Sequence, residues 1–155
     1  MTLLVWRGLE EWLAESCEVG LDGDHLHARG VQLGAEPHPY RADYELTTGA
    51  DWVTERLTVT VRDAGGERSL DLVRAPDGSW TANGEPLPDV AGALDCDLAF
   101  SPLTNFMPAR RLTDGAGVRY IALDGDFTAD LELDEDGFVV RYPRLAERVP
   151  SGGRA

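Results

Sequence analysis

Residues 40–47 have the sequence YRADYELT, in which apolar and polar side chains alternate one by one. Successive side chains of a strand point to opposite faces of a sheet, so this alternation predicts a strand with one buried face. Residues 53–61 and 127–133 alternate in the same way. Shorter alternating runs lie at residues 12–21, 24–33, 67–74, 78–82, 117–123 and 138–142. We therefore expect strands in roughly half of the chain, well above the usual share of about 20–25%.

Turn sequences separate these runs. The turns contain pairs that readily adopt a positive φ, namely Asp22-Gly23, Gly65-Gly66, Asp77-Gly78, Asn83-Gly84 and Asp136-Gly137. Such pairs are typical of tight hairpins. A mainly β fold follows, with antiparallel strands in a meander, a barrel or a sandwich. Helix is expected in at most one or two short segments, of which the best is Thr104–Met107, ended by Pro108.

The length and composition indicate one folded unit. A chain of 155 residues with 43% hydrophobic residues is long enough to bury a core without disulfides or metals. No internal repeat or linker divides it, so we expect a single domain over residues 1–150. The Gly-rich end at residues 151–155 is expected to be disordered.

The net charge is −14, with 28 acidic and 14 basic residues. Binding to nucleic acid or to an anionic membrane surface depends on an excess of basic groups, so both partners are excluded. All the basic residues are arginines. The chain therefore has no lysine for Schiff-base chemistry.

The chain shows no targeting segment. Its apolar start, Met1–Trp6, is interrupted by Arg7 and is too short for a secretory signal. No apolar run reaches the about 18 residues of a transmembrane helix. We expect a cytoplasmic protein in which Cys17 and Cys96 are reduced and buried.

Residues 95–112 have the irregular sequence DCDLAFSPLTNFMPARRL. This stretch resembles the central signature of the bacterial putative glycolipid-binding family, in which an acidic-Cys-acidic strand leads through Ser-Pro-x-Thr-Asn into Pro-x-Arg-Arg-Leu. The resemblance extends over about residues 6–148. Its other landmarks are Trp6, Trp52, Trp80 and Asp136-Gly137…Tyr142-Pro143.

The resemblance implies an open, half-barrel sheet similar to bacterial lipoprotein carriers, which shelter acyl chains. It also implies a lipid-like or glycolipid-like ligand held in the groove of that sheet. One departure concerns residues 122–127, where this chain is shorter than the family pattern. A missing hairpin there would make the sheet narrower and the groove shorter or more open.

Two interpretations exist for the arginines of the signature. Arg110 and Arg111 can pair with Asp95 and Asp97 and clamp a loop across the sheet, because buried charges are normally paired. Alternatively, one arginine stays free to bind the head group of a ligand. Asn105 either satisfies backbone groups of the same loop or contacts the ligand.

The tryptophans and Phe106 also have two interpretations. They either anchor the core or line a cavity in which their rings pack on acyl chains or sugars. The threonine-rich face of residues 52–62, which carries Trp52 and Arg56, is one candidate lining. The candidate ligand-binding residues are Trp52, Arg56, Trp80, Asn105, Phe106, Arg110 and Arg111.

Two other classes of function are considered. His25 and His27 lie on one face of a strand and, with His38 or Asp24, suggest a metal site and a metal-dependent enzyme. Otherwise, the protein is a structural or interaction domain whose exposed sheet edge forms a homodimer. The sequence contains no nucleophile elbow, phosphate loop or dinucleotide motif, so neither catalysis nor a cofactor is expected. Cys96 is a poor nucleophile because the two flanking acids raise its pKa.

Overall fold

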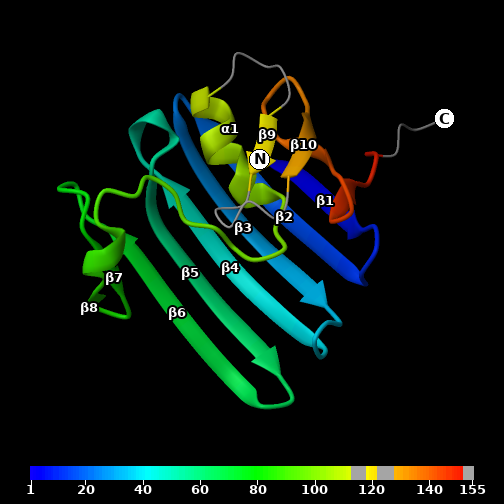
Figure 1. Ribbon diagram of the computed structural model, residues 1–155, viewed down its shortest axis with the longest axis horizontal. Coiled ribbons are helices and arrows are strands. Elements are labelled where there is room, and N and C mark those ends of the chain that lie inside the picture. Colours follow the sequence, from blue (N-terminus) through cyan, green and yellow to red (C-terminus); the bar gives the residue numbers. More distant parts are fainter. Residues whose placement is uncertain (113–117, 122–127, 152–155) are drawn as a thin grey trace.

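The computed structural model describes residues 1–112, 118–121 and 128–151, and its strands form one large antiparallel sheet (Figure 1). The order of strands across the sheet is β8-β7-β6-β5-β4-β3-β2-β1-β12-β11-β10-β9. The strands are β1 Thr2–Gly8, β2 Leu13–Asp22, β3 His25–Gly34, β4 Tyr40–Thr48, β5 Thr54–Asp63, β6 Gly66–Arg74, β7 Trp80–Ala82, β8 Glu85–Pro86, β9 Val118–Ile121, β10 Thr128–Leu133, β11 Val139–Tyr142 and β12 Ala146–Arg148.

The alternating runs of the sequence all correspond to strands, which confirms the mainly β prediction. Alternation does not predict β1, β8 or β12. Of these, β1 is the most important, because it lies between β2 and β12 and joins the first hairpins to the last ones. Within β1, Leu4 and Trp6 are buried while Leu3 is 59% exposed.

The sheet is open. Its order begins at β8 and ends at β9, and it is not closed into a barrel. The open, half-barrel alternative is therefore confirmed, and the closed barrel and the sandwich are wrong. The prediction of a shortened hairpin at residues 122–127 lies outside the described residues, as does most of the predicted disordered tail.

One face of the sheet is partly covered by helical turns and a long connection (Figure 1). These turns are three 3-10 segments, η1 Ala50–Trp52, η2 Pro88–Val90 and η3 Leu103–Asn105, and one helix, α1 Phe106–Leu112. The helix is longer than predicted, because Pro108 does not end it. Pro108 lies in the first turn of α1, where a backbone N–H has no partner within the helix and a proline is tolerated.

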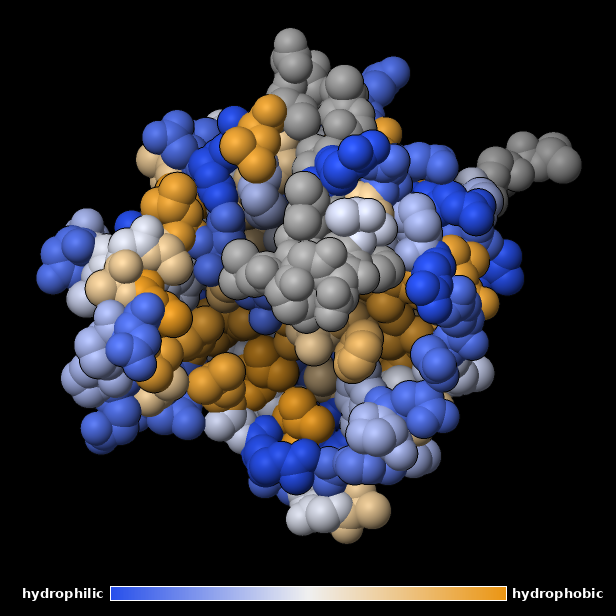
Figure 2. All heavy atoms as spheres, in the orientation of Figure 1, coloured by the Kyte–Doolittle hydropathy of each residue, from blue (hydrophilic) through white to orange (hydrophobic). Residues whose placement is uncertain are grey.

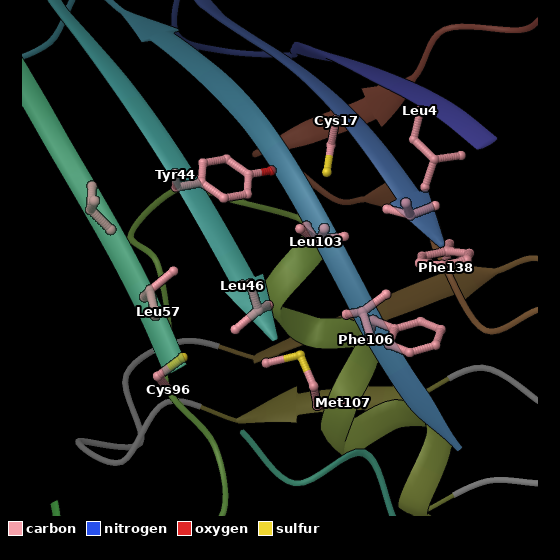
Figure 3. Packing of buried hydrophobic residues seen from close by; sticks show 14 of the residues in the cluster. Leu4, Cys17, Tyr44, Leu46, Leu57, Cys96, Leu103, Phe106, Met107 and Phe138 are labelled. Carbon is pink, nitrogen blue, oxygen red and sulfur yellow. The ribbon is translucent and has the colours of Figure 1, made fainter. Parts of the chain in front are cut away.

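The core lies between α1 and the covered face of the sheet (Figure 3). Phe106 and Met107 of α1 have no exposed surface and belong to the same apolar cluster as Leu46 of β4. The ring of Phe106 stacks on Phe138 at 4.3 Å and meets the edge of Trp52 at 5.2 Å. The helix is therefore attached to the sheet mainly by apolar and aromatic packing.

Three of the tryptophans, Trp6, Trp52 and Trp80, are buried as predicted for core anchors. Trp12 is not, since 63% of it is exposed. Both cysteines are buried and free.

A bulge at the start of β5 changes which residues face the core. Thr48 of β4 pairs with Thr54, whereas Thr47 pairs with Arg56, so Glu55 is an additional residue in β5. The bulge places Thr54 on the same face as Leu57, and Thr54 is fully buried. The prediction that Thr54 shares the face of Arg56 is wrong, because strict alternation fails at a bulge.

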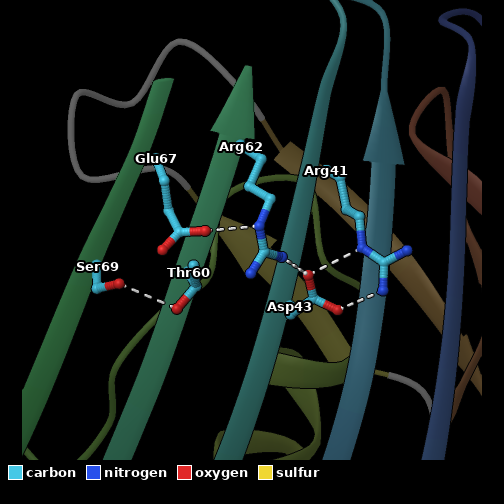
Figure 4. Close-up of polar contacts among 6 residues, drawn as sticks. All are labelled: Arg41, Asp43, Thr60, Arg62, Glu67 and Ser69. Atoms are coloured by element: carbon cyan, nitrogen blue, oxygen red, sulfur yellow. Dashed lines mark hydrogen bonds and ion pairs between the residues drawn. The ribbon is translucent and has the colours of Figure 1, made fainter. Parts of the chain in front are cut away.

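The other face of the sheet carries charged pairs across neighbouring strands (Figure 4). Asp43 of β4 accepts hydrogen bonds from Arg41 at 2.6 and 2.9 Å and from Arg62 of β5 at 2.7 Å. Arg62 also reaches Glu67 of β6 at 2.7 Å. Opposite charges on adjacent strands support the register of the sheet, each pair by about 0.2–1 kcal/mol.

Candidate functional site

Phe100 lines all three of the hollows described below, which lie on the covered face of the sheet. It lies in the loop between β8 and α1, its side chain is 54% exposed, and its φ is +64°. The left-handed conformation is uncommon for a bulky residue and costs about 1–2 kcal/mol. Strained backbone often occurs at ligand-binding sites, and the ring of Phe100 is half-exposed, so Phe100 is the first candidate for ligand contact.

Two of the hollows have mostly apolar linings. The first has a volume of about 100 Å³ and lies beside the exposed indole of Trp12. The second has a volume of about 230 Å³ and lies over the uncovered part of β3, β4 and β5. Figure 2 shows apolar side chains exposed in a hollow on this face. Tyr40 and Phe100 line both hollows. The first hollow is also lined by Leu13 and Leu145, and the second by Ala42, Val61 and Leu98.

The third hollow, on another side of Phe100, is more polar and has a volume of about 200 Å³. Its lining includes the polar side chains of Asp97, Ser101 and Asn105, the ring of Tyr142, and the apolar side chains of Leu98 and Leu145. Asp97 accepts a hydrogen bond from the hydroxyl of Thr104 at 2.5 Å. Although the residue as a whole is exposed, its carboxyl lies against the loop, and this burial raises the pKa of Asp97.

A buried polar cluster holds the loop of Phe100 on the sheet. The carboxylate of Glu15, which is 1% exposed, accepts hydrogen bonds from Tyr44 at 2.6 Å and from Ser101 at 2.7 Å. The amide of Gln32 donates to Glu15 at 3.4 Å and to the carbonyl of Ala99 at 3.2 Å. The two residues that flank Phe100 are therefore tied to β2 and β3.

Register and glycines explain how this cluster forms. Glu15 and Gln32 are directly opposite one another on β2 and β3. The ring of Tyr44 lies over Gly30, where a Cβ atom would come within 2.3 Å of it, and its hydroxyl reaches Glu15. The ring of Tyr40 lies over Gly34 in the same way, and its hydroxyl donates to Gln32 at 2.8 Å.

Burial controls the protonation of this cluster. It raises the pKa of Glu15, although the hydrogen bonds from Tyr44, Ser101 and Gln32 act in the opposite direction. Burial also raises the pKa of Tyr44 and of Tyr40, and the nearby Glu15 adds to both shifts. A carboxyl that is withdrawn from water in this way can be kept only where its oxygen atoms have donors, as they do here.

The arginines of the signature are both engaged in the structure. Arg111 forms an ion pair with Asp95 and donates to the carbonyl of Trp52 at 3.1 Å. Arg110 lies over the ring of Trp52, with its guanidinium carbon 5.2 Å from the ring centre. The predicted clamp therefore includes Arg111 and Asp95, whereas Asp97 binds Thr104 instead of an arginine.

The structure brings Trp52, Phe106, Arg110 and Arg111 together, but the other predicted residues lie elsewhere. Arg56 lies on the outer face and binds Asp71 at 2.8 and 3.0 Å. Trp52, Phe106 and Trp80 are buried within the core, and the indole of Trp80 donates to the carbonyl of Ala93 at 3.0 Å. Asn105 is the predicted ligand residue that lines one of the three hollows around Phe100.

The histidines bind separate carboxylates. His25 lies 2.9 Å from Asp24, and His27 lies 2.9 Å from Glu45. Among the residues that the structure describes, no group of three or more His, Cys, Asp or Glu residues is arranged to hold a metal ion. No helix in the described ranges is long and apolar enough to cross a membrane. For Cys96, the pKa is raised to about 11, mainly by burial and only secondarily by Asp95 and Asp97.

Sequence reasoning missed most of the residues that surround the hollows, above all Phe100 and Tyr40, whereas Trp12 was considered among the tryptophans that anchor the core or line a cavity. Two signals were present. Glu15 occupies an inward position between apolar residues of β2, and Gly30 occupies one in β3. An acid on a buried face and a glycine inside a strand both indicate a close polar or aromatic approach.

The comparisons with known proteins agree with this architecture. A family model described as "Putative glycolipid-binding" matches residues 3–117. The fold is similar to the crystal structure of a DUF1089 family protein from Pseudomonas aeruginosa, with a TM-score of 0.74 and 28% sequence identity. The alignment covers 93% of this chain and 95% of the other. No curated protein matches the chain. Since the family model covers most of the chain, the protein belongs to the putative glycolipid-binding family.

Proposed function

We propose that the protein binds a lipid-like or glycolipid-like molecule in the hollows around Phe100. The observation that carries this proposal is the position of Phe100, which is exposed and has a strained backbone where three hollows meet. Membership of a family described as glycolipid-binding supports the same class of ligand.

The architecture suits an amphiphilic ligand. Ligand sites are usually apolar concavities with a few polar groups that fix the orientation of the ligand. The second hollow offers Tyr40, Ala42, Val61 and Leu98 to an acyl chain. The hydroxyl of Tyr40 donates to Gln32, so this polar group is already paired within the protein.

Trp12 provides a direct measurement of binding. It lines the first hollow and is 63% exposed, whereas Trp6, Trp52 and Trp80 are at most 8% exposed. A ligand that enters the hollow will transfer the indole of Trp12 from water to an apolar environment. We expect titration with a short-chain amphiphile to shift the tryptophan emission to the blue in a saturable manner.

The matched control is Trp12→Phe, which keeps an apolar ring but removes the signal. Native mass spectrometry of both proteins measures binding independently of fluorescence and reveals any ligand that co-purifies. No saturable shift in the wild type, together with no bound amphiphile in either protein, would contradict the proposal.

A further inference from the structure

The three hollows differ in chemistry, and this difference divides the site. The hollow lined by Asp97, Ser101 and Asn105 has a polar and apolar lining in similar shares, whereas the other two are mainly apolar. The polar hollow shares Phe100 and Leu98 with one apolar hollow, and Phe100 and Leu145 with the other. One molecule can therefore occupy a polar and an apolar hollow on different sides of Phe100.

Two oxygen atoms of the polar hollow are available to a ligand. Asp97 uses one carboxylate oxygen to accept from Thr104, and its other oxygen has no partner among the described residues. Asn105 donates its amide N–H to the carbonyl of Ser101 at 3.3 Å, and its amide oxygen has no partner in the same part of the chain. Both free atoms are acceptors, so they require hydrogen-bond donors such as the hydroxyl groups of a sugar.

The surroundings do not favour an anionic head group. Arg111 is bound to Asp95, Arg110 lies over Trp52, and Arg144, at the rim of the first hollow, is bound to Glu10 at 2.9 and 3.2 Å. Arg68, which lines the second hollow, is bound to Asp63. A phosphate would have to displace one of these partners, and in the polar hollow it would approach the carboxylate of Asp97. Recognition of phosphate normally depends on arginines that are free to form bidentate pairs.

We propose that the polar hollow is a selectivity site for an uncharged, hydroxyl-bearing head group. Asp97 and Asn105 accept hydrogen bonds from its hydroxyls, and the apolar body of the same molecule crosses Phe100 into the apolar hollows. This inference rests on the proposed function, which it refines by naming the head group and the residues that select it.

The test compares three probes that share an eight-carbon chain and differ in their head groups. These are n-octyl β-D-glucoside, 1-octanol and octyl phosphate, each titrated below its aggregation concentration and followed by Trp12 emission and calorimetry. We expect the glucoside to bind about five- to tenfold more tightly than octanol, which corresponds to one or two net hydrogen bonds. Octyl phosphate should bind more weakly than the glucoside because of the charge of Asp97.

Two independent variants locate the selectivity. In Asp97→Ala and in Asn105→Ala, the advantage of the glucoside over octanol should shrink to about two- to threefold, because each variant removes one of the two acceptors. Glu135→Ala is the control for charge, since Glu135 is an exposed acid in the turn after β10 and lines none of the three hollows. Glu135→Ala should retain the full preference for the glucoside over octanol. Thermal unfolding of each variant establishes that it is folded.

The outcomes separate this inference from the proposed function. Equal affinity for glucoside and octanol, a preference for phosphate, or an advantage that survives both variants would overturn the selectivity site while leaving a lipid site intact. The absence of saturable binding by all three probes would instead remove the proposed function, and the selectivity site with it.

Discussion

At the scale of single residues, Glu15 and Phe100 both lie in environments that are unfavourable for their side chains. Glu15 is a carboxyl buried in the sheet, and three neighbouring donors compensate for the loss of its hydration. Phe100 is a large apolar side chain that is 54% exposed, on a residue with a φ of +64°. The hydrogen bonds of Glu15 account for its burial, whereas the exposure of Phe100 is the feature that the proposed ligand would explain.

Replacement of Phe100 separates these two roles. Phe100→Gly removes the ring, and glycine adopts a positive φ without strain, so relief of about 1–2 kcal/mol offsets the additional entropy of the unfolded chain. We expect the free energy of unfolding to change by less than about 1 kcal/mol, while affinity for octyl glucoside falls at least tenfold. Urea unfolding and probe titration measure the two quantities. A large loss of stability with unchanged binding would show that Phe100 has a structural role instead.

Glu15 should make stability depend on pH. Its pKa in the folded protein is raised above its ordinary value of 4.5, so the protonated form is favoured by folding. This contribution is complete below pH 4.5 and is lost as the pH rises through the folded pKa. Glu15→Gln keeps the shape of the side chain but cannot ionise. Relative to this variant, the wild type should therefore lose stability as the pH rises from 4 to 8 in urea unfolding. If the difference in stability between the wild type and Glu15→Gln stays constant from pH 4 to 8, the raised pKa of Glu15 is contradicted.

At the scale of elements, β3 and β4 form a repeated arrangement of glycines and tyrosines. Gly30 and Gly34 on β3 leave room for the rings of Tyr44 and Tyr40 on β4, and the hydroxyls of both tyrosines extend towards the polar cluster. The missing side chains on β3 thus allow residues of β4 to contact Glu15 and Gln32. The position of the Phe100 loop depends on this arrangement.

Gly30→Ala tests that dependence. A Cβ atom there would lie 2.3 Å from the ring of Tyr44, so the ring must move away and Glu15 loses a donor. We expect a loss of about 2–4 kcal/mol in the free energy of unfolding, from overpacking and an unsatisfied carboxyl. Gly20→Ala is the matched control, because its Cβ would meet only the flexible end of Met1 at 3.1 Å. It should cost less than about 1 kcal/mol. Equal effects of the two variants would argue against the packing of Tyr44 over Gly30.

Alternation of side chains predicted β3 and β4 well because each of them has one buried face along its whole length, and it also predicted β6, in which no residue is buried. It did not predict β1, whose first residues are apolar on both faces, or the bulge at Glu55, which depends on the pairing of β4 with β5. The candidate site was harder to predict, because it is assembled from β2, β3, β4 and the signature loop. Arg111 and Asp95 are close in sequence and their pairing was foreseen, whereas the approach of Phe100 to Tyr40 depends on the curved sheet as a whole.

At the scale of the whole molecule, the position of β1 determines whether the sheet behaves as one unit. The first strand of the chain pairs with β2 on one side and with β12, the last strand, on the other. The indole of Trp6 also donates to the carbonyl of Val139 in β11 at 2.8 Å. Neither the hairpins before α1 nor those after it can complete the sheet without β1.

We therefore expect one cooperative unfolding transition. Far-UV circular dichroism, which reports the whole sheet, and tryptophan emission, to which the buried Trp6 at the junction contributes together with the other three tryptophans, should give the same midpoint in urea. Leu4→Ala removes a buried side chain of β1 and should lower the free energy of unfolding by about 2–4 kcal/mol, with both signals shifting together. Leu21→Ala, at a position that is 42% exposed in β2, is the control and should shift both signals only slightly. Two separate transitions, or a Leu4→Ala effect confined to one signal, would mean that the two parts of the sheet fold independently of β1.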